Sequence, residues 1–405
     1  MNISIISYGH IDSITALSKY LSKRGNIVNL FIVVYDDRFV NSIADFDLTN
    51  IPYGIVNLKE LKGTSVDTDN LIDYTKDFNC WLLKLPSRSL KDPKNLKHIY
   101  RCCKFIKENK CDVVHFNGES AHQITFYLLL KNIPKVLTIH DYIPHSGENH
   151  NQHKNSFLRN FHYKAKYFYI HHSYYYRNLM LSEKALPDYR VKTIYYAPFD
   201  FYDYYNPQIK IDEYPSAIFF GRISPYKGLE YFCKAIEIVH RIIPDAKYYI
   251  LGRGNFYFDI NSYTEKYPIE IINKTHIENN TLTQYISRAS VVIIPYTDAT
   301  QSGVVVTAYS FNKPVIASKT GGIPEIVVDG ETGYLVEPKN PEQLAEKMVY
   351  LFQNRNKLDY MSNMIRKLKN DTTNRFMNWS KIAEETEDYY QKTVESFHKI
   401  GTVLK

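Results

Sequence analysis

A short loop with two cations five residues apart is the sharpest chemical feature of this 405-residue sequence. The loop lies within residues 219–228, FFGRISPYKG, where an apolar run ends. Gly221 lets the backbone turn close to a ligand. Arg222 offers a planar fork for phosphate oxygens, and Lys227 adds a point charge. The two cations can meet one diphosphate from two sides, although their spacing alone fits a surface loop with two solvated charges equally well.

Two further loops follow apolar runs later in the chain. The turn LGRG contains Gly252 and lets a ligand approach the backbone, but glycine turns after strands are common. The run QSGV comprises Gln301, Ser302, Gly303 and Val304 and begins a predicted helix, whose free N–H groups and dipole favour anions. An ordinary serine N-cap is the better supported alternative unless the other loops converge on the same place.

The elements that must carry these loops alternate between short apolar runs and longer amphipathic ones. Near-continuous apolar runs are typical of parallel strands buried on both faces, and their alternation with helices predicts a doubly wound α/β sheet. The strand-like runs are Ile3–Ser7, Ile27–Tyr35, Asp112–Phe116, Lys135–His140 and Lys166–His171 in the first half, and Ala217–Phe220, Ala246–Leu251, Ile269–Asn273, Ser290–Pro295 and Pro314–Ala317 in the second. A segment rich in Pro, Asp and Tyr interrupts the series between them.

We therefore predict two Rossmann-like domains that face a cleft. Residues 1–200 form the first, residues 201–216 a linker, and residues 217–375 the second. Residues 376–405 hold a final helix that packs back on the N-terminal domain. Ligands of such open sheets bind at the carboxyl ends of the strands, which is where the loops described above lie.

The stretch from Ala217 to Pro338 resembles family 4 of the retaining glycosyltransferases, also called glycosyl transferases group 1. The resemblance rests on five ordered motifs: FGR…KG, LGRG, KPVIAS, GGIPE and DGETGYLV. It implies a GT-B fold, with a UDP- or GDP-sugar donor held mostly by the C-terminal domain and a glycan or lipid-linked acceptor held by the N-terminal domain. The donor contacts that it implies are Gly9, Arg222, Lys227, Gly252, Gln301, Ser302, Gly303, Val304 and Thr307.

One departure from the family pattern concerns its pair of glutamates. These stand seven residues apart in the family, where the first contacts the donor sugar and the second the ribose. Thr300 and Thr307 occupy the two positions here. Threonine can form a hydrogen bond, but it cannot accept from two hydroxyls as a carboxylate does. A non-catalytic GT-B subunit that binds or scaffolds is therefore the alternative to an active retaining hexosyltransferase in polysaccharide or glycolipid biosynthesis.

The N-terminal half resembles the family more loosely. Gly9 follows the first predicted strand, where family members use a glycine turn to touch the diphosphate, although a plain turn fits nearly as well. His115 ends another strand and is either a packed histidine or a catalytic one. His140 and Asp141 stand in a loop that also holds His145 and Glu148. Family context places His140 near the donor sugar or the acceptor, whereas a structural turn is the alternative.

Composition sets the remaining expectations. The five cysteines show no C-x-x-C spacing, so we expect neither a zinc site nor a disulfide framework, and no cofactor or metal. The sequence shows no signal peptide or membrane-spanning run, which predicts a cytoplasmic protein. The net charge of +7 is too modest to indicate nucleic acid. Basic residues recur every three or four positions over residues 91–110, and aromatic and basic residues mix over Lys154–Lys166. This pattern suits peripheral attachment to an anionic membrane, with a solvated helix face as the alternative.

Overall fold

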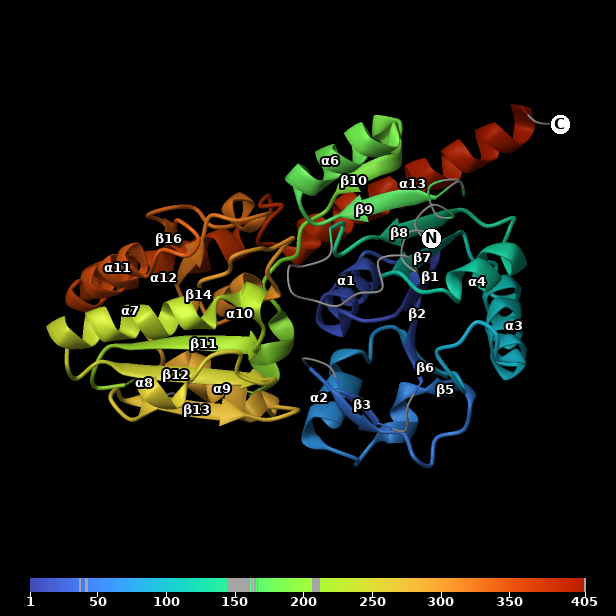
Figure 1. Cartoon of the computed structure of the whole chain (residues 1–405). Helices are drawn as coiled ribbons and strands as arrows, with labels where there is room; N and C mark the ends of the chain where they lie inside the picture. The colour runs from blue at the N-terminus through green and yellow to red at the C-terminus, as the bar shows by residue number, and fades with distance from the viewer. Residues whose placement is uncertain are drawn as a thin grey trace.

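The protein folds around two parallel β-sheets, each covered by helices (Figure 1). The computed structural model describes residues 1–35, 38–40, 43–143, 161, 163, 165, 167–205 and 212–403. The predicted His145 and Glu148, and most of the predicted Lys154–Lys166 stretch, lie outside these ranges. The two sheets confirm the predicted fold class of two Rossmann-like domains.

The first sheet has eight strands in the order β10-β9-β8-β7-β1-β2-β6-β5. All of its pairs are parallel except β5, which runs antiparallel to β6. Seven of the eight residues of β2 are buried, as expected of a strand that is covered on both faces. The strands are β1 (Asn2–Ser7), β2 (Ile27–Val34), β5 (Gly54–Asn57), β6 (Asn79–Lys84), β7 (Val113–Asn117), β8 (Lys135–Thr138), β9 (Phe168–His171) and β10 (Val191–Thr193), and β3 (Arg38–Val40) and β4 (Asp45–Asp47) form a separate ribbon. Their helices are α1 (Ile11–Lys23), α2 (Val66–Tyr74), α3 (Pro93–Glu108), α4 (Gln123–Leu129) and α6 (Tyr174–Lys184), with short 3-10 turns η1 (Leu58–Leu61) and η2 (Asp188–Arg190).

The second sheet has six parallel strands in the order β13-β12-β11-β14-β15-β16. The order reverses between β11 and β14, which makes this the point where a ligand of the sheet is expected. The strands are β11 (Ser216–Arg222), β12 (Lys247–Arg253), β13 (Ile269–Asn273), β14 (Val291–Ile294), β15 (Val315–Ser318) and β16 (Gly333–Val336). The helices are α7 (Leu229–Ile242), α8 (Asn261–Thr264), α9 (Asn279–Arg288), α10 (Gly303–Ser310), α11 (Pro341–Gln353) and α12 (Arg355–Asn370), with 3-10 turns η4 (Pro225–Lys227) and η5 (Ile323–Glu325).

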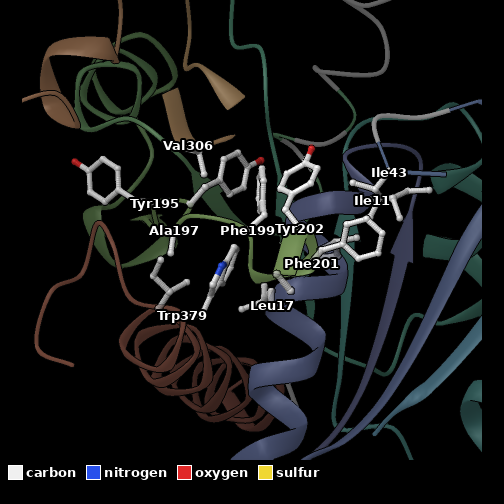
Figure 2. Close-up of a cluster of buried hydrophobic side chains, with 14 of the residues drawn as sticks. Ile11, Leu17, Ile43, Tyr195, Ala197, Phe199, Phe201, Tyr202, Val306 and Trp379 are labelled. Carbon is white, nitrogen blue, oxygen red and sulfur yellow. The ribbon is translucent and has the colours of Figure 1, made fainter. Parts of the chain in front are cut away.

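An aromatic segment joins the two domains. It includes the 3-10 turn η3 (Asp200–Tyr205), and its Phe199, Phe201 and Tyr202 side chains are buried (Figure 2). Phe199 stacks against Trp379 at the start of α13 (Trp379–Val403), whereas Phe201 packs edge-on against Tyr74 of α2. The Trp379 indole donates a hydrogen bond to the carbonyl of Pro198 at 2.8 Å. The described part of the connection, as far as Tyr205, is therefore packed into the core.

The last helix returns to the N-terminal domain. α13 starts beside the connecting segment and runs back along that domain, next to α1 (Figure 1). Its Tyr389 hydroxyl donates to the carbonyl of Tyr169 in β9 at 3.0 Å. None of the described helices combines the length and the apolar character needed to cross a bilayer.

Candidate functional site

A cavity of about 380 Å³ lies between the two domains, at the carboxyl ends of strands from the second sheet. Both of its described carboxylates, Asp12 and Asp141, come from the N-terminal domain. Its lysine and arginine side chains come from the C-terminal domain: Arg222, Lys227, Arg253 and Lys274. The two domains thus place opposite charges across one space, as a ligand with an anionic end and a hydroxyl-bearing end requires.

Strand pairing explains why three of the four cations lie next to one another. Gly221 in β11 pairs with Gly252 in β12, and Gly252 pairs with the last residue of β13. The residue after each of these three is a cation: Arg222 and Arg253 end β11 and β12, and Lys274 directly follows β13. Arg253 and Lys274 were not predicted as site residues. The signal that could have found them is the same one that marked Arg222, a cation directly after an apolar strand.

The backbones of β11 and β12 pack closely together at these strand ends. A Cβ atom on Gly252 would lie 2.5 Å from the carbonyl oxygen of Gly221 and 3.0 Å from a side-chain carbon of Ile223. Gly221 has φ 122°, a conformation that favours glycine. A side chain at position 252 would therefore force β11 and β12 apart where both face the cavity.

Lys227 reaches the cavity from η4. Its ammonium nitrogen lies 3.8 Å from the ring centroid of Tyr296 and 5.1 Å from that of Tyr226. Such cation–π contacts orient a lysine that is only partly hydrated. The structure places both Arg222 and Lys227 at the cavity, whereas their spacing alone left a solvated surface loop as an equal alternative.

The start of α10 forms another part of the wall. Gly303 and Val304 line the cavity, whereas Ser302 is buried and accepts a hydrogen bond from the backbone N–H of Val305 at 3.4 Å. Ser302 therefore acts as the N-cap, which was the alternative that its sequence left open. The side chain of Gln301 lines the cavity, and its amide nitrogen is buried without a hydrogen-bond partner among the described residues. A buried donor of this kind is expected to meet a ligand or water.

The two threonines at the glutamate positions lie beside groups from outside the C-terminal domain. The hydroxyl of Thr300 donates to a carboxylate oxygen of Asp141 at 2.5 Å. Thr307 lines the cavity together with Tyr202 of the connecting segment. A carboxylate is therefore present beside Thr300, but it is supplied by the facing domain.

The N-terminal wall contains two stacked imidazole rings. His10 lines the cavity in a left-handed conformation, with φ 52°, and its ring lies parallel to that of His140 with 3.6 Å between centroids. His140 is bonded on both nitrogens, to the Asn117 side-chain oxygen at 2.9 Å and to the Tyr196 hydroxyl at 2.7 Å. Burial and then the neighbouring His10 hold the pKa of His140 well below its usual value. His140 is therefore neutral and sits behind His10.

Gly9 is positioned by the same network. Its carbonyl accepts hydrogen bonds from the Ser7 hydroxyl at 2.7 Å and from the Asn117 amide at 2.9 Å. Because the Asn117 amide nitrogen donates to Gly9, its oxygen accepts from His140. His140 thereby supports the turn that presents His10, a residue that the sequence analysis did not single out as a ligand contact.

The structure does not bring His115 to the cavity. Its side chain is 1% exposed, and it bonds the Thr138 hydroxyl at 2.7 Å and the Tyr390 hydroxyl at 2.6 Å. Burial lowers the pKa of His115 to about 3. This geometry corresponds to the packed histidine that the sequence left as the alternative, and it joins β7 and β8 to α13.

Comparisons with known proteins agree with this arrangement. Residues 214–354 match the family described as "Glycosyl transferases group 1". An uncharacterized glycosyltransferase of Methanocaldococcus jannaschii is 25% identical over 358 residues, which is 86% of this chain and 87% of that protein. The second domain is therefore a glycosyl transferases group 1 domain, in a chain whose relatives are glycosyltransferases.

Solved structures share the whole fold. Sucrose-phosphate synthase from Thermosynechococcus elongatus aligns with a TM-score of 0.67 at 15% identity, over 98% of this chain and 100% of that one. Anabaena HepE in complex with UDP-glucose aligns with a TM-score of 0.64 at 15% identity, over 96% and 99% of the two chains. The two-domain arrangement is thus the GT-B fold.

Proposed function

We propose that this chain transfers a sugar from a nucleoside diphosphate donor to a glycan or lipid-linked acceptor, with retention of configuration. The observation that carries the proposal is the cavity with four cations on one side and two carboxylates from the other domain on the opposite side. The cations suit a diphosphate, and carboxylates suit the hydroxyls of a sugar. Since the Anabaena relative was solved with UDP-glucose, UDP is the first nucleotide to test, with GDP second.

The same residues account for the chemical step. As the bond between the anomeric carbon and the diphosphate oxygen breaks, negative charge grows on the leaving group, and Arg222, Lys227 and their neighbours stabilise it. The N-terminus of α10 adds aligned N–H groups at Gly303 and Val304. The acceptor hydroxyl attacks the anomeric carbon on the face from which the diphosphate leaves and passes its proton to the departing phosphate oxygen, which retains the configuration. In this proposal no metal ion takes part.

Asp141 is the group that we assign to the donor sugar. One of its oxygens is held by the Thr300 hydroxyl, which fixes the carboxylate at the cavity wall. Asp12 lies in the first turn of α1 on the same side, and His10 precedes that helix. Together they form the face that the sugar meets when the diphosphate lies on the cations.

Two measurements test the proposal. Thermal unfolding of the full chain with UDP, GDP and the corresponding adenosine nucleotide should show stabilisation by one uridine or guanosine diphosphate, because a ligand that binds only the folded state raises stability. Donor hydrolysis should then be measured across UDP- and GDP-sugars. A chain that binds nucleotide but turns over no donor, and supports transfer only with a partner protein, would instead be the non-catalytic subunit.

The exposed face of α3 supports a lipid-linked acceptor. Five basic residues of the predicted stripe are exposed on this helix, together with Leu96 and Tyr100, which are 54% and 57% exposed. The opposite face of the helix is buried. Cations next to exposed apolar side chains favour an anionic bilayer surface. The exposed cations of α3 are Lys94, Lys97, Arg101, Lys104 and Lys107.

Vesicle flotation tests this attachment. The chain should float with phosphatidylglycerol vesicles at low salt, and the double variant Lys97→Glu with Arg101→Glu should not. Arg366→Glu with Lys367→Glu on the exposed face of α12 removes the same charge elsewhere and should float normally. Equal loss in both double variants would mean that net charge, and not α3, drives binding.

A further inference from the structure

The GGIPE motif lies outside the donor cavity, and its glutamate reaches across to the N-terminal domain. One carboxylate oxygen of Glu325 accepts from the Ser173 hydroxyl at 2.7 Å and from the backbone N–H of Tyr175 at 3.0 Å. The other accepts from the backbone N–H of Tyr174 at 2.7 Å and from the Tyr195 hydroxyl at 2.8 Å. All four donors belong to the N-terminal domain or to the segment that follows it. We call this set of contacts the Glu325 clasp.

The clasp completes the start of helix α6. The first N–H groups of a helix have no partner within the helix, and the positive end of its dipole favours an anion. Ser173 is the N-cap and accepts from the backbone N–H of Tyr176, while Glu325 takes the N–H groups of Tyr174 and Tyr175. Charge-assisted hydrogen bonds of this kind are stronger than neutral ones. The capping of an N-terminal helix therefore depends on a C-terminal carboxylate, and it is complete only when the domains are together.

The hydroxyl of Tyr195 is suited to this contact. Burial and then the Glu325 carboxylate raise the pKa of Tyr195, so the hydroxyl keeps its proton and donates it. Tyr195 belongs to the buried segment that joins the domains (Figure 2). The clasp is thus anchored at the connection as well as at α6.

The two glycines of the motif link the clasp to the donor cavity. A Cβ atom on Gly321 would lie 1.4 Å from the carbonyl oxygen of Ala299, and one on Gly322 would lie 2.7 Å from that of Thr300 and 2.9 Å from the Ser173 side chain. The N–H of Gly322 also donates to the Thr300 carbonyl at 3.1 Å. The motif therefore packs directly against the loop whose Thr300 hydroxyl holds Asp141.

We propose that Glu325 is a positioning residue for sugar transfer: by capping α6 from the opposite domain, it holds the domains in the arrangement in which Thr300 meets Asp141 beside the donor. This inference rests on the proposed function. It assigns the motif a role in closing the cleft and none in binding the nucleotide. Its consequence is that donor affinity and turnover respond differently when the clasp is broken.

The test compares Glu325→Gln with Glu331→Gln in the full chain. The first variant puts an amide group where four donors converge, so it loses part of the clasp while keeping the size of the side chain. The second makes the same change at an exposed glutamate six residues further on. Three quantities are measured: amide hydrogen exchange at Tyr174 and Tyr175, the radius of gyration by X-ray scattering, and UDP affinity together with transfer kinetics.

For Glu325→Gln we expect faster exchange at both amides, a larger radius of gyration, and a fall in kcat of about 10- to 100-fold, because small misplacements of reacting groups cost that much. The Kd for UDP should stay within about twofold, since the four cations lie on the C-terminal domain. Glu325→Asp keeps the charge and should recover part of kcat. Glu331→Gln should match the unaltered chain in every measurement.

Several results would overturn the inference. Unchanged kcat in Glu325→Gln would show that the clasp does not position the site. An increase in Kd as large as the fall in kcat would make Glu325 part of the donor site instead. If Glu325→Gln does not fold, Tyr195→Phe with Ser173→Ala removes two contacts from the other side and must give the same pattern. Failure of the unaltered chain to bind any nucleoside diphosphate refutes the proposed function, whereas exchange and scattering still report whether the clasp joins the domains.

Discussion

The contribution of Lys227 to nucleotide binding can be predicted from its surroundings. Lys227→Met removes the charge and keeps most of the length of the side chain. A hydrogen bond to a charged group contributes about 1.5–3 kcal/mol, which corresponds to a Kd ratio of about 10 to 150. The ammonium lies against two tyrosine rings and is only partly exposed, so it is less screened than a surface lysine. We therefore expect the Kd for UDP to rise by about 10- to 100-fold.

Titration calorimetry with UDP measures this change, and the chain supplies a matched control. Lys234 in α7 also lies over a tyrosine ring, at 5.2 Å from the centroid of Tyr231, but it is exposed on α7 and is not a lining residue of the cavity. Lys234→Met should leave the Kd within about twofold. The dependence of Kd on salt should also weaken in Lys227→Met alone. Equal affinities for the two variants would refute the diphosphate role of Lys227.

Three further outcomes are expected. Thr300→Val removes the hydroxyl that donates to the Asp141 carboxylate, so kcat should fall by about tenfold while the Kd for UDP stays unchanged. Steady-state kinetics and calorimetry measure the two quantities, and an unchanged kcat would contradict the reasoning. Gly252→Ala should separate two strand ends, lower the free energy of unfolding by about 1–3 kcal/mol and weaken UDP binding, as urea denaturation and calorimetry can show. Burial lowers the pKa values of His115 and His172 to about 3, so the unfolded chain binds protons that the folded chain does not. Stability should therefore fall as pH drops below about 6.5, by about 1.4 kcal/mol per pH unit for each histidine, and urea unfolding at pH 7, 6 and 5 would refute this if the slope were flat.

The sequence predicts those parts of the site that depend on local order. Arg222 follows an apolar strand and a glycine, and strand ends of a parallel sheet share one edge, so its place at the cavity could be inferred without knowing its neighbours. The buried strands could also be predicted from local sequence, because each is a near-continuous apolar run. β6, with the sequence NCWLLK, was not predicted as a strand, although four of its six residues are buried. Its antiparallel partner β5 is only four residues long and carries little apolar signal.

The rest of the site depends on contacts between distant residues. The hydrogen bond from Thr300 to Asp141 joins positions 159 residues apart, and that from Tyr175 to Glu325 joins positions 150 apart. No local pattern encodes such pairs, because the two partners come together only where the domains meet. His115, which the sequence offered as a catalytic residue, does not line the cavity for a related reason. The structure places His115 in the middle of β7, where its side chain faces the covering helix α13.

The two threonines in place of glutamates change what a single domain can do. Had both carboxylates stood at positions 300 and 307, the C-terminal domain alone would carry the groups for the diphosphate and for the sugar. Here the carboxylates that line the cavity, Asp12 and Asp141, belong to the opposite domain. Under the proposed function, the C-terminal domain supplies the cations for the diphosphate, and the sugar meets carboxylates only when the N-terminal domain is in place. This division makes the contact between Thr300 and Asp141, and the Glu325 clasp behind it, the part of the molecule where an active enzyme and a silent nucleotide-binding subunit would differ most.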